Sequence, residues 1–146
     1  MRVLKLGSGV SSAGQMRKLD RAMSESPEKV SRALDAQCAA AVAVVTALEA
    51  GDDVFAVLAH HEKTLIALDR AAHLDIESDV YSRAHEVLRD GHAILRTSGA
   101  GAGDSAWVVA RSEQELEPAL AALAEDGYGL LDVRVGGRGL EIEGGS

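Results

Sequence analysis

A continuous run of helical patterns, about sixty residues long, occupies the centre of this chain and constrains its fold more than any other feature. The first helix begins at Ser26-Pro27-Glu28, where a serine cap, a proline at the first helical position and an acid near the helix dipole coincide. It is expected to end at Ala50, because Gly51 favours a helix stop. Its apolar stripe consists of Val30, Leu34, Cys38, Val42, Val45 and Leu48.

Two further helices are expected within this run. Asp52 and Asp53 can cap the second helix, which ends near His73, and a third spans Asp79–Arg89 before Gly91. No linker or change in composition interrupts the run, so these helices should belong to one domain. The buried stripe of the second helix is predicted to be Val54, Leu58, His61, Leu65 and Leu68.

Strand patterns lie on both sides of the helical run. Before it, Arg2–Leu6 reads as a strand, and a capping box at Ser12–Gln15 predicts a short helix to about Met23. After it, a second capping box at Ser112 predicts a helix to Glu125. The remaining strands are expected at His92–Leu95, Ala106–Ala110, Tyr128–Val135 and Leu140–Glu143. This order predicts an α+β fold in which several helices cover a small antiparallel sheet, as one domain over residues 1–143 with a frayed tail at 144–146.

Charge and composition argue against several classes of partner. The 146 residues carry 15 basic and 23 acidic side chains, a net charge of −8, and no basic run typical of nucleic-acid binding. The most apolar window, Ala39–Leu48, is too short to span a bilayer, and no secretory signal pattern is present. Cys38 is the sole cysteine and cannot form an internal disulfide. We therefore expect a cytoplasmic protein that binds neither nucleic acid nor membrane.

The segment Arg96–Asp104, with the sequence RTSGAGAGD, is the strongest candidate for a binding site. Its three glycines leave backbone N–H groups accessible enough to surround an anion such as phosphate. It lacks the Gly-Lys-Ser/Thr ending of a P-loop and leads into a strand, where a Rossmann turn would lead into a helix. A glycine-rich hairpin connection with an aspartate turn is the alternative interpretation.

The same segment resembles the third conserved motif of the GHMP kinase superfamily. It is most similar to the phosphomevalonate kinase branch, in which a basic residue precedes Ser-Gly-Ala-Gly and an aspartate follows two further small residues. In these kinases the motif belongs to a C-terminal domain. Leu6–Ala13 and Leu74–Ile76 are similar to other parts of that domain. Ala102 stands where that family usually has glycine, and Ser105 where cysteine is common. The resemblance covers essentially the whole chain and implies the ferredoxin-like fold of that domain.

The resemblance implies that this chain is the acceptor- and phosphate-binding half of an ATP-dependent small-molecule kinase of isoprenoid biosynthesis. ATP and Mg²⁺ would be held mainly by an N-terminal half, the acceptor would be a small phosphorylated metabolite, and the catalytic residues are unknown. Because an N-terminal half would cover an apolar face, we expect binding to such a partner or self-association. The residues expected to bind phosphate or substrate are Arg96, Ser98, Gly99, Ala100, Gly101, Gly103, Asp104, Ser8, Ser11 and Ser12.

Two other functions are open at this point. A non-catalytic interaction or regulatory module could keep the fold without the chemistry, and another branch of the superfamily, such as mevalonate kinase or diphosphomevalonate decarboxylase, could share the motif. No metal site is expected, because the adjacent His60 and His61 would point about 100° apart on a helix.

Overall fold

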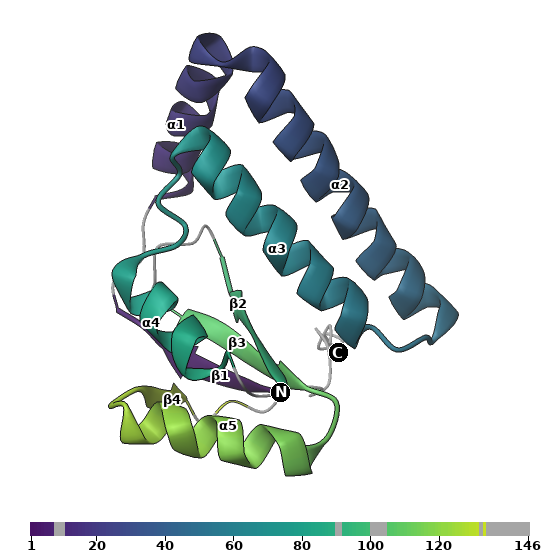
Figure 1. The fold of residues 1–146 in the computed structure, drawn as a ribbon, viewed down its shortest axis with the longest axis vertical. Coiled ribbons are helices and arrows are strands. Elements are labelled where there is room, and N and C mark those ends of the chain that lie inside the picture. The colour runs from purple at the N-terminus through teal and green to yellow at the C-terminus, as the bar shows by residue number, and fades with distance from the viewer. Residues whose placement is uncertain (8–10, 90–91, 100–104, 132, 134–146) are drawn as a thin grey trace, which may run out of the picture.

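The computed structural model describes residues 1–7, 11–89, 92–99, 105–131 and 133, and places five helices and four strands within them (Figure 1). The strands are β1 (Arg2–Lys5), β2 (Ala93–Thr97), β3 (Ser105–Ala110) and β4 (Gly129–Leu131). The helices are α1 (Ser12–Glu25), α2 (Pro27–Ala50), α3 (Phe55–Ala72), α4 (Asp79–Val87) and α5 (Glu113–Glu125). The strand expected at Leu140–Glu143 and the tail expected at 144–146 lie outside the described residues.

The described strands form one antiparallel sheet in the order β2-β3-β1-β4. If α1 to α4 are counted as one crossover, the chain follows a β-α-β-β-α-β order, which together with this strand order is the ferredoxin-like arrangement. The predicted α+β class, with helices covering a small antiparallel sheet, is confirmed. Because β1 and β2 are each antiparallel to β3, they run in the same direction and end at the same end of the sheet.

One face of the sheet packs against α4 and α5. Leu4, Leu95 and Val108 project onto this face from three neighbouring strands and are almost completely buried. Each fully buried side chain of this kind contributes roughly 1.5–3 kcal/mol, so this cluster holds the sheet and its two helices together. The helices supply Tyr81, Ala84, Leu116, Ala119, Leu120 and Leu123.

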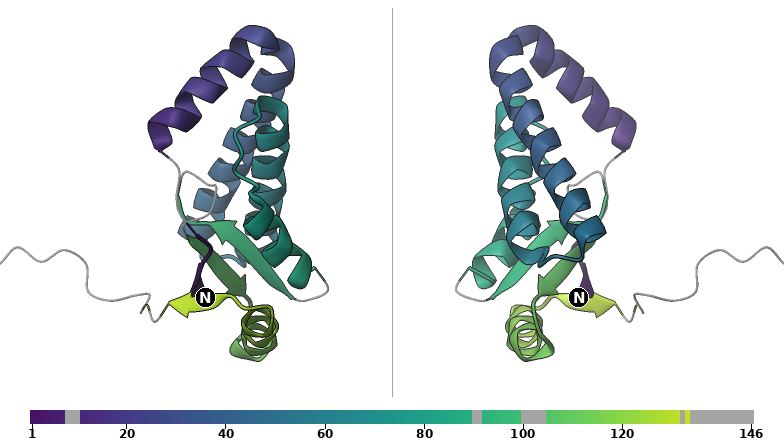
Figure 2. Two further views of the ribbon diagram at one scale, coloured as in Figure 1. Left: turned by 90° about the vertical axis from the view of Figure 1, so that its left-hand side faces the viewer. Right: turned by 90° about the vertical axis from the view of Figure 1, so that its right-hand side faces the viewer.

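A second apolar cluster lies within the layer formed by α1, α2 and α3. Figure 2 shows α2 and α3 side by side above the sheet. Val30, Leu68 and Ala72 are buried in this cluster, together with residues of α1 and of the segment that follows α3. In its C-terminal half α2 buries only small residues, Ala40 and Ala47, which allows a close approach to α3.

The helix boundaries lie close to the predicted ones, but several predicted caps differ. At α2, Ser26 makes no side-chain cap hydrogen bond, and at α3 the N-cap is Val54, although Asp53 Oδ1 accepts the Phe55 N–H at 2.9 Å. α2 begins and ends at the predicted residues, and the Ser112 hydroxyl accepts the Glu115 N–H at 3.2 Å at the start of α5, as predicted. At α1 the capping residue is Ser11, not Ser12. Ser11 has an extended backbone and its hydroxyl accepts the N–H of Gly14, whereas Ser12 is already the first helical residue.

The apolar stripe predicted on α2 is buried only at its start. Val30 is inaccessible to solvent, but Val42, Val45 and Leu48 are 65%, 53% and 61% exposed. Within the part of the chain that the structure describes, α2 is also the one helix long and apolar enough to cross a membrane by length and composition. Core helices of soluble proteins meet the same criteria, so the predicted localisation stays a prediction.

Candidate functional site

The candidate site lies at the end of the sheet where β1 and β2 both terminate. Arg96 pairs with Trp107 and Lys5 pairs with Ser105, while the Ser98 N–H donates to the Ser105 carbonyl oxygen at 3.2 Å. Paired residues of antiparallel strands, and residues two apart along a strand, project from the same face. The register therefore gathers two cations and two hydroxyls on one face, opposite the face that α4 and α5 cover.

Ser98 closes the hairpin that contains the glycine-rich segment. Its hydroxyl donates to the Ser105 carbonyl oxygen at 3.1 Å and lies 2.5 Å from the Ser105 hydroxyl oxygen. Gly99, which follows, is exposed, and a methyl group added to it would meet no atom of the described residues within 4 Å. Ser98 thus links the ends of β2 and β3, and the described residues leave the space beside Gly99 open.

The Arg96 side chain is four-fifths buried and points toward α3. Its Nε atom lies 4.0 Å from Oε2 of Glu62, and the side chain is 20% exposed. His61, on the same helix, has its pKa lowered by burial first and then by the charge of Arg96. The structure therefore holds a fixed positive charge two residues before Ser98, in a setting that excludes much of the surrounding water.

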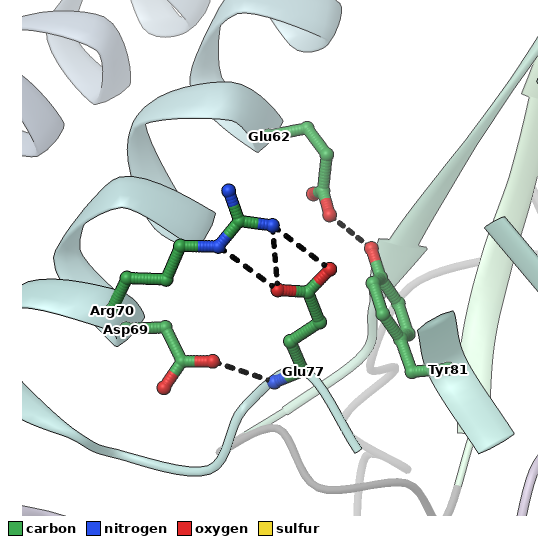
Figure 3. A network of polar contacts seen from close by, with 5 residues as sticks. All are labelled: Glu62, Asp69, Arg70, Glu77 and Tyr81. Atoms are coloured by element: carbon green, nitrogen blue, oxygen red, sulfur yellow. Dashed lines mark hydrogen bonds and ion pairs between the residues drawn. The ribbon is translucent and has the colours of Figure 1, made fainter. Parts of the chain in front are cut away.

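Glu62 and Tyr81 form a buried hydrogen-bonded pair (Figure 3). Arg96 lies beside Glu62. Glu62 on α3 is 3% exposed and Tyr81 on α4 is 1% exposed. The Tyr81 hydroxyl contacts Oε1 of Glu62 and also lies 3.0 Å from the carbonyl oxygen of Leu95, on the edge strand β2. Burial raises the pKa of Glu62 above its ordinary value of 4.5, against the opposing effects of the Tyr81 bond and the Arg96 charge. Burial also raises the pKa of Tyr81, and the Glu62 charge adds to this effect.

Two further polar contacts fix the segment between α3 and α4. Asp69 Oδ2 accepts the backbone N–H of Glu77 at 2.7 Å, and Arg70 Nη2 lies 3.0 Å from Glu77 Oε2 (Figure 3). These bonds set the start of α4 and hence the position of Tyr81. Beside this segment, α3, α4 and β2 line a partly open cavity of about 590 Å³, whose lining includes Glu62, Arg70, Glu77, Ser82, His85 and Ile94.

The predicted site residues are only partly brought together. Arg96, Ser98 and Gly99 lie in sequence at the end of β2. Ser11 caps α1 and Ser12 is exposed at its first turn, and no hydrogen bond or ion pair in the described residues joins either serine to Arg96 or Ser98. The other predicted residues lie outside the described part of the chain, namely Ser8, Ala100, Gly101, Gly103 and Asp104.

Lys5, Glu62 and Tyr81 are not among the site residues predicted from the sequence. A lysine at the end of a strand, just before a glycine-rich turn, was the available signal for Lys5. Helical periodicity placed His61 on the buried stripe, whereas Glu62 is the more buried residue and His61 contacts Gln37 of α2 at 3.0 Å. No group of three or more metal-ligating side chains occurs among the residues described.

Comparisons with known proteins inform the fold alone. No protein-family model matches this chain, and no curated protein matches its sequence. Among solved structures, a Lin0012 protein from Listeria innocua superimposes with a TM-score of 0.78 over 89% of this chain, at 16% sequence identity. The matched region is 37% of the length of that protein, so this chain is similar to a part of a longer structure.

Proposed function

We propose that this chain is the acceptor- and phosphate-binding half of an ATP-dependent small-molecule kinase that resembles phosphomevalonate kinase. In this proposal the phosphate of the acceptor lies at the shared end of β1, β2 and β3. ATP and Mg²⁺ are implied by the resemblance alone, and a second half of the enzyme would supply most of their ligands.

The observation that supports the proposal most is the convergence of polar groups at this end of the sheet. Arg96 and Gly99 lie more than ninety residues after Lys5 in sequence, and the strand register brings these residues to one end of the sheet. Phosphoryl transfer depends chiefly on positioning the reactants and on neutralising their charge. A buried guanidinium and a lysine on one face suit the binding of an acceptor phosphate.

Calorimetric titration of the 146-residue chain tests this proposal. We expect inorganic phosphate and 5-phosphomevalonate to bind, with the second binding more tightly because it offers further contacts. Arg96→Ala should weaken both affinities by about tenfold or more, since a charge-assisted hydrogen bond contributes roughly 1.5–3 kcal/mol. Lys5→Ala should weaken them less, because the Lys5 side chain is exposed.

Arg2→Ala is the matched control. This substitution removes one positive charge from β1, as Lys5→Ala does. Arg2, however, pairs with Val108 and lies at the opposite end of the strand from Lys5. It should leave both affinities unchanged. If neither ligand binds, or if Arg2→Ala weakens binding as much as Arg96→Ala does, the proposed anion site is wrong.

A second candidate function is a non-catalytic interaction module. The exposed Val42, Val45 and Leu48 on α2 favour it, because an apolar helix face of this kind suits contact with another protein. This candidate predicts a protein partner or self-association with no affinity for phosphate or 5-phosphomevalonate, so the same titration separates the two.

A further inference from the structure

The hydroxyl of Tyr81 lies between two oxygen atoms and carries only one proton. It contacts Oε1 of Glu62 and lies 3.0 Å from the carbonyl oxygen of Leu95. If Glu62 is ionised, both neighbouring oxygens are acceptors, and the hydroxyl can donate to only one of them. If Glu62 is protonated, its carboxyl O–H donates to the Tyr81 oxygen and the Tyr81 O–H donates to Leu95. Only the protonated form satisfies both contacts.

Burial favours the same form. Glu62 is 3% exposed, and its Oε2 atom accepts no hydrogen bond from the residues that the structure describes. An ionised carboxylate with one oxygen left without a donor is costly in such a setting. The ion pair with Arg96, at 4.0 Å between Oε2 and Nε, is too long to be a hydrogen bond.

The protonation of Glu62 determines what Arg96 can bind. A neutral Glu62 leaves the Arg96 guanidinium without an ion pair among the described residues, two residues from Ser98 on the same face of β2. An ionised Glu62 would attract that guanidinium and compete with any anion at the end of the strand. We propose that Glu62 is a positioning residue, held by Tyr81 as a neutral acid, that makes the Arg96 charge available to the acceptor phosphate. This inference rests on the proposed function.

The other charged groups near Glu62 leave this coupling intact. Glu77, from the segment before α4, is paired with Arg70. His61 has a lowered pKa, caused by burial and by the charges of Arg96 and His60, so it is mainly neutral at neutral pH. Tyr81 has a raised pKa, for which burial is the main cause, and keeps its proton. Glu62 is therefore the acid of this cluster with a raised pKa, and the Glu62→Gln variant separates its effect from that of any charge on His60, His61 or His85, the last of which lines the same cavity beside Tyr81.

Sulfate is the probe that isolates this effect, because it stays a dianion across the range in which phosphate changes charge. We expect the wild-type chain to bind sulfate about tenfold more tightly at about pH 5.5 than at about pH 8.5, a coupling within the usual range for linked sites. Glu62→Gln should bind sulfate with the tighter affinity at both pH values, since its amide donates to Tyr81 without any negative charge. Glu86→Gln, which alters another acid lining the same cavity, should keep the wild-type pH dependence.

Carbon-13 NMR titration of the glutamate side-chain carboxyl groups gives an independent measurement on the wild-type chain. The Glu62 signal should titrate above the ordinary glutamate value of 4.5, because burial raises the pKa of its carboxyl group. Saturating sulfate should raise the titration midpoint of Glu62 by about one further pH unit. By linkage, a tenfold effect of Glu62 protonation on sulfate affinity implies a tenfold effect of sulfate on Glu62 protonation. In Arg96→Ala, sulfate should leave the midpoint unchanged.

The outcomes separate this inference from the proposed function. Sulfate binding that depends on Arg96 but is equally pH-dependent in wild type and Glu62→Gln would overturn the inference and leave the anion site standing. Absence of sulfate binding to the wild-type chain at both pH values would overturn both. A Glu62 carboxyl signal that titrates at or below the ordinary value of 4.5 would overturn the inference even if Glu62→Gln does not fold.

Discussion

Replacing Tyr81 with phenylalanine tests the buried polar cluster through stability. The aromatic ring stays in the core, so the change removes one hydroxyl and no apolar packing. The Leu95 carbonyl oxygen and the Glu62 carboxyl group then both lose their partner. A buried group left without its hydrogen bond costs about 1–3 kcal/mol, and some relaxation is expected, so Tyr81→Phe should lower the free energy of unfolding by about 2–4 kcal/mol. This is a large part of the 5–15 kcal/mol typical of a whole domain.

Urea unfolding followed by circular dichroism measures this loss, and the second tyrosine provides a matched control. The Tyr128 hydroxyl donates to the Val80 carbonyl oxygen at 2.9 Å in an exposed setting, where water can replace it. Tyr128→Phe should therefore cost about 1 kcal/mol or less, with an unchanged dependence on urea concentration for both variants. If the two variants lose equal stability, the Glu62–Tyr81–Leu95 cluster does not have the energetic role assigned to it.

Three further predictions concern pH, helix capping and association. The pKa of Glu62 is raised in the folded chain, chiefly by burial. The stability that the protonated Glu62 side chain contributes is therefore complete below pH 4.5, its ordinary pKa, and is lost as the pH rises through the raised pKa. Compared with wild type, Glu62→Gln should therefore be more stable at about pH 8 than at about pH 4.5. Urea unfolding at both pH values measures this difference, and an equal effect at both pH values would contradict the raised pKa. Ser11→Ala should lower the free energy of unfolding by about 1 kcal/mol and Ser12→Ala by clearly less, because Ser11 is the N-cap, and the reverse order would restore the sequence-based assignment. Sedimentation velocity should show that the wild-type chain self-associates, that Val42→Glu abolishes this association and that Glu49→Gln does not. A wild-type chain that stays monomeric at high concentration would count against association through α2.

The features that the sequence predicted best depend on local chemistry. α2 has the predicted bounds because the signals at both of its ends, Ser26-Pro27-Glu28 and Gly51, act on the backbone within one turn. The α+β class followed from the order of periodic patterns, and the structure confirms it. At α1 two adjacent serines offered equivalent caps, and only the backbone conformation of Ser11 distinguishes them.

The features that it missed depend on which element packs against which. Periodicity identified an apolar stripe on α2 but could not determine what that stripe faces. The small side chains of Ala40 and Ala47 are the buried ones in this half of α2, whereas Val42 and Val45 face solvent. His61 and Glu62 are neighbours on α3, and a stripe through either has helical spacing. Glu62 is buried because Tyr81 approaches from α4, a contact between residues 19 apart that no local pattern encodes.

The location of the candidate site follows from topology more than from the glycine-rich segment. A hairpin alone would place that segment at one end of two strands, with no second segment beside it. Here β3 lies between β1 and β2, which run in the same direction, so the chain must cross back over the sheet before β2 begins. Lys5 precedes this crossover and Arg96 follows it, and both lie at the same end of the sheet. The crossover includes α3, which runs alongside β2 and brings Glu62 to within 4.0 Å of Arg96. The connection that brings Lys5 and Arg96 to one end of the sheet therefore also brings Glu62 beside Arg96. In the proposed site Glu62 does not touch the anion, so a change of anion affinity in a Glu62 variant would act through Arg96.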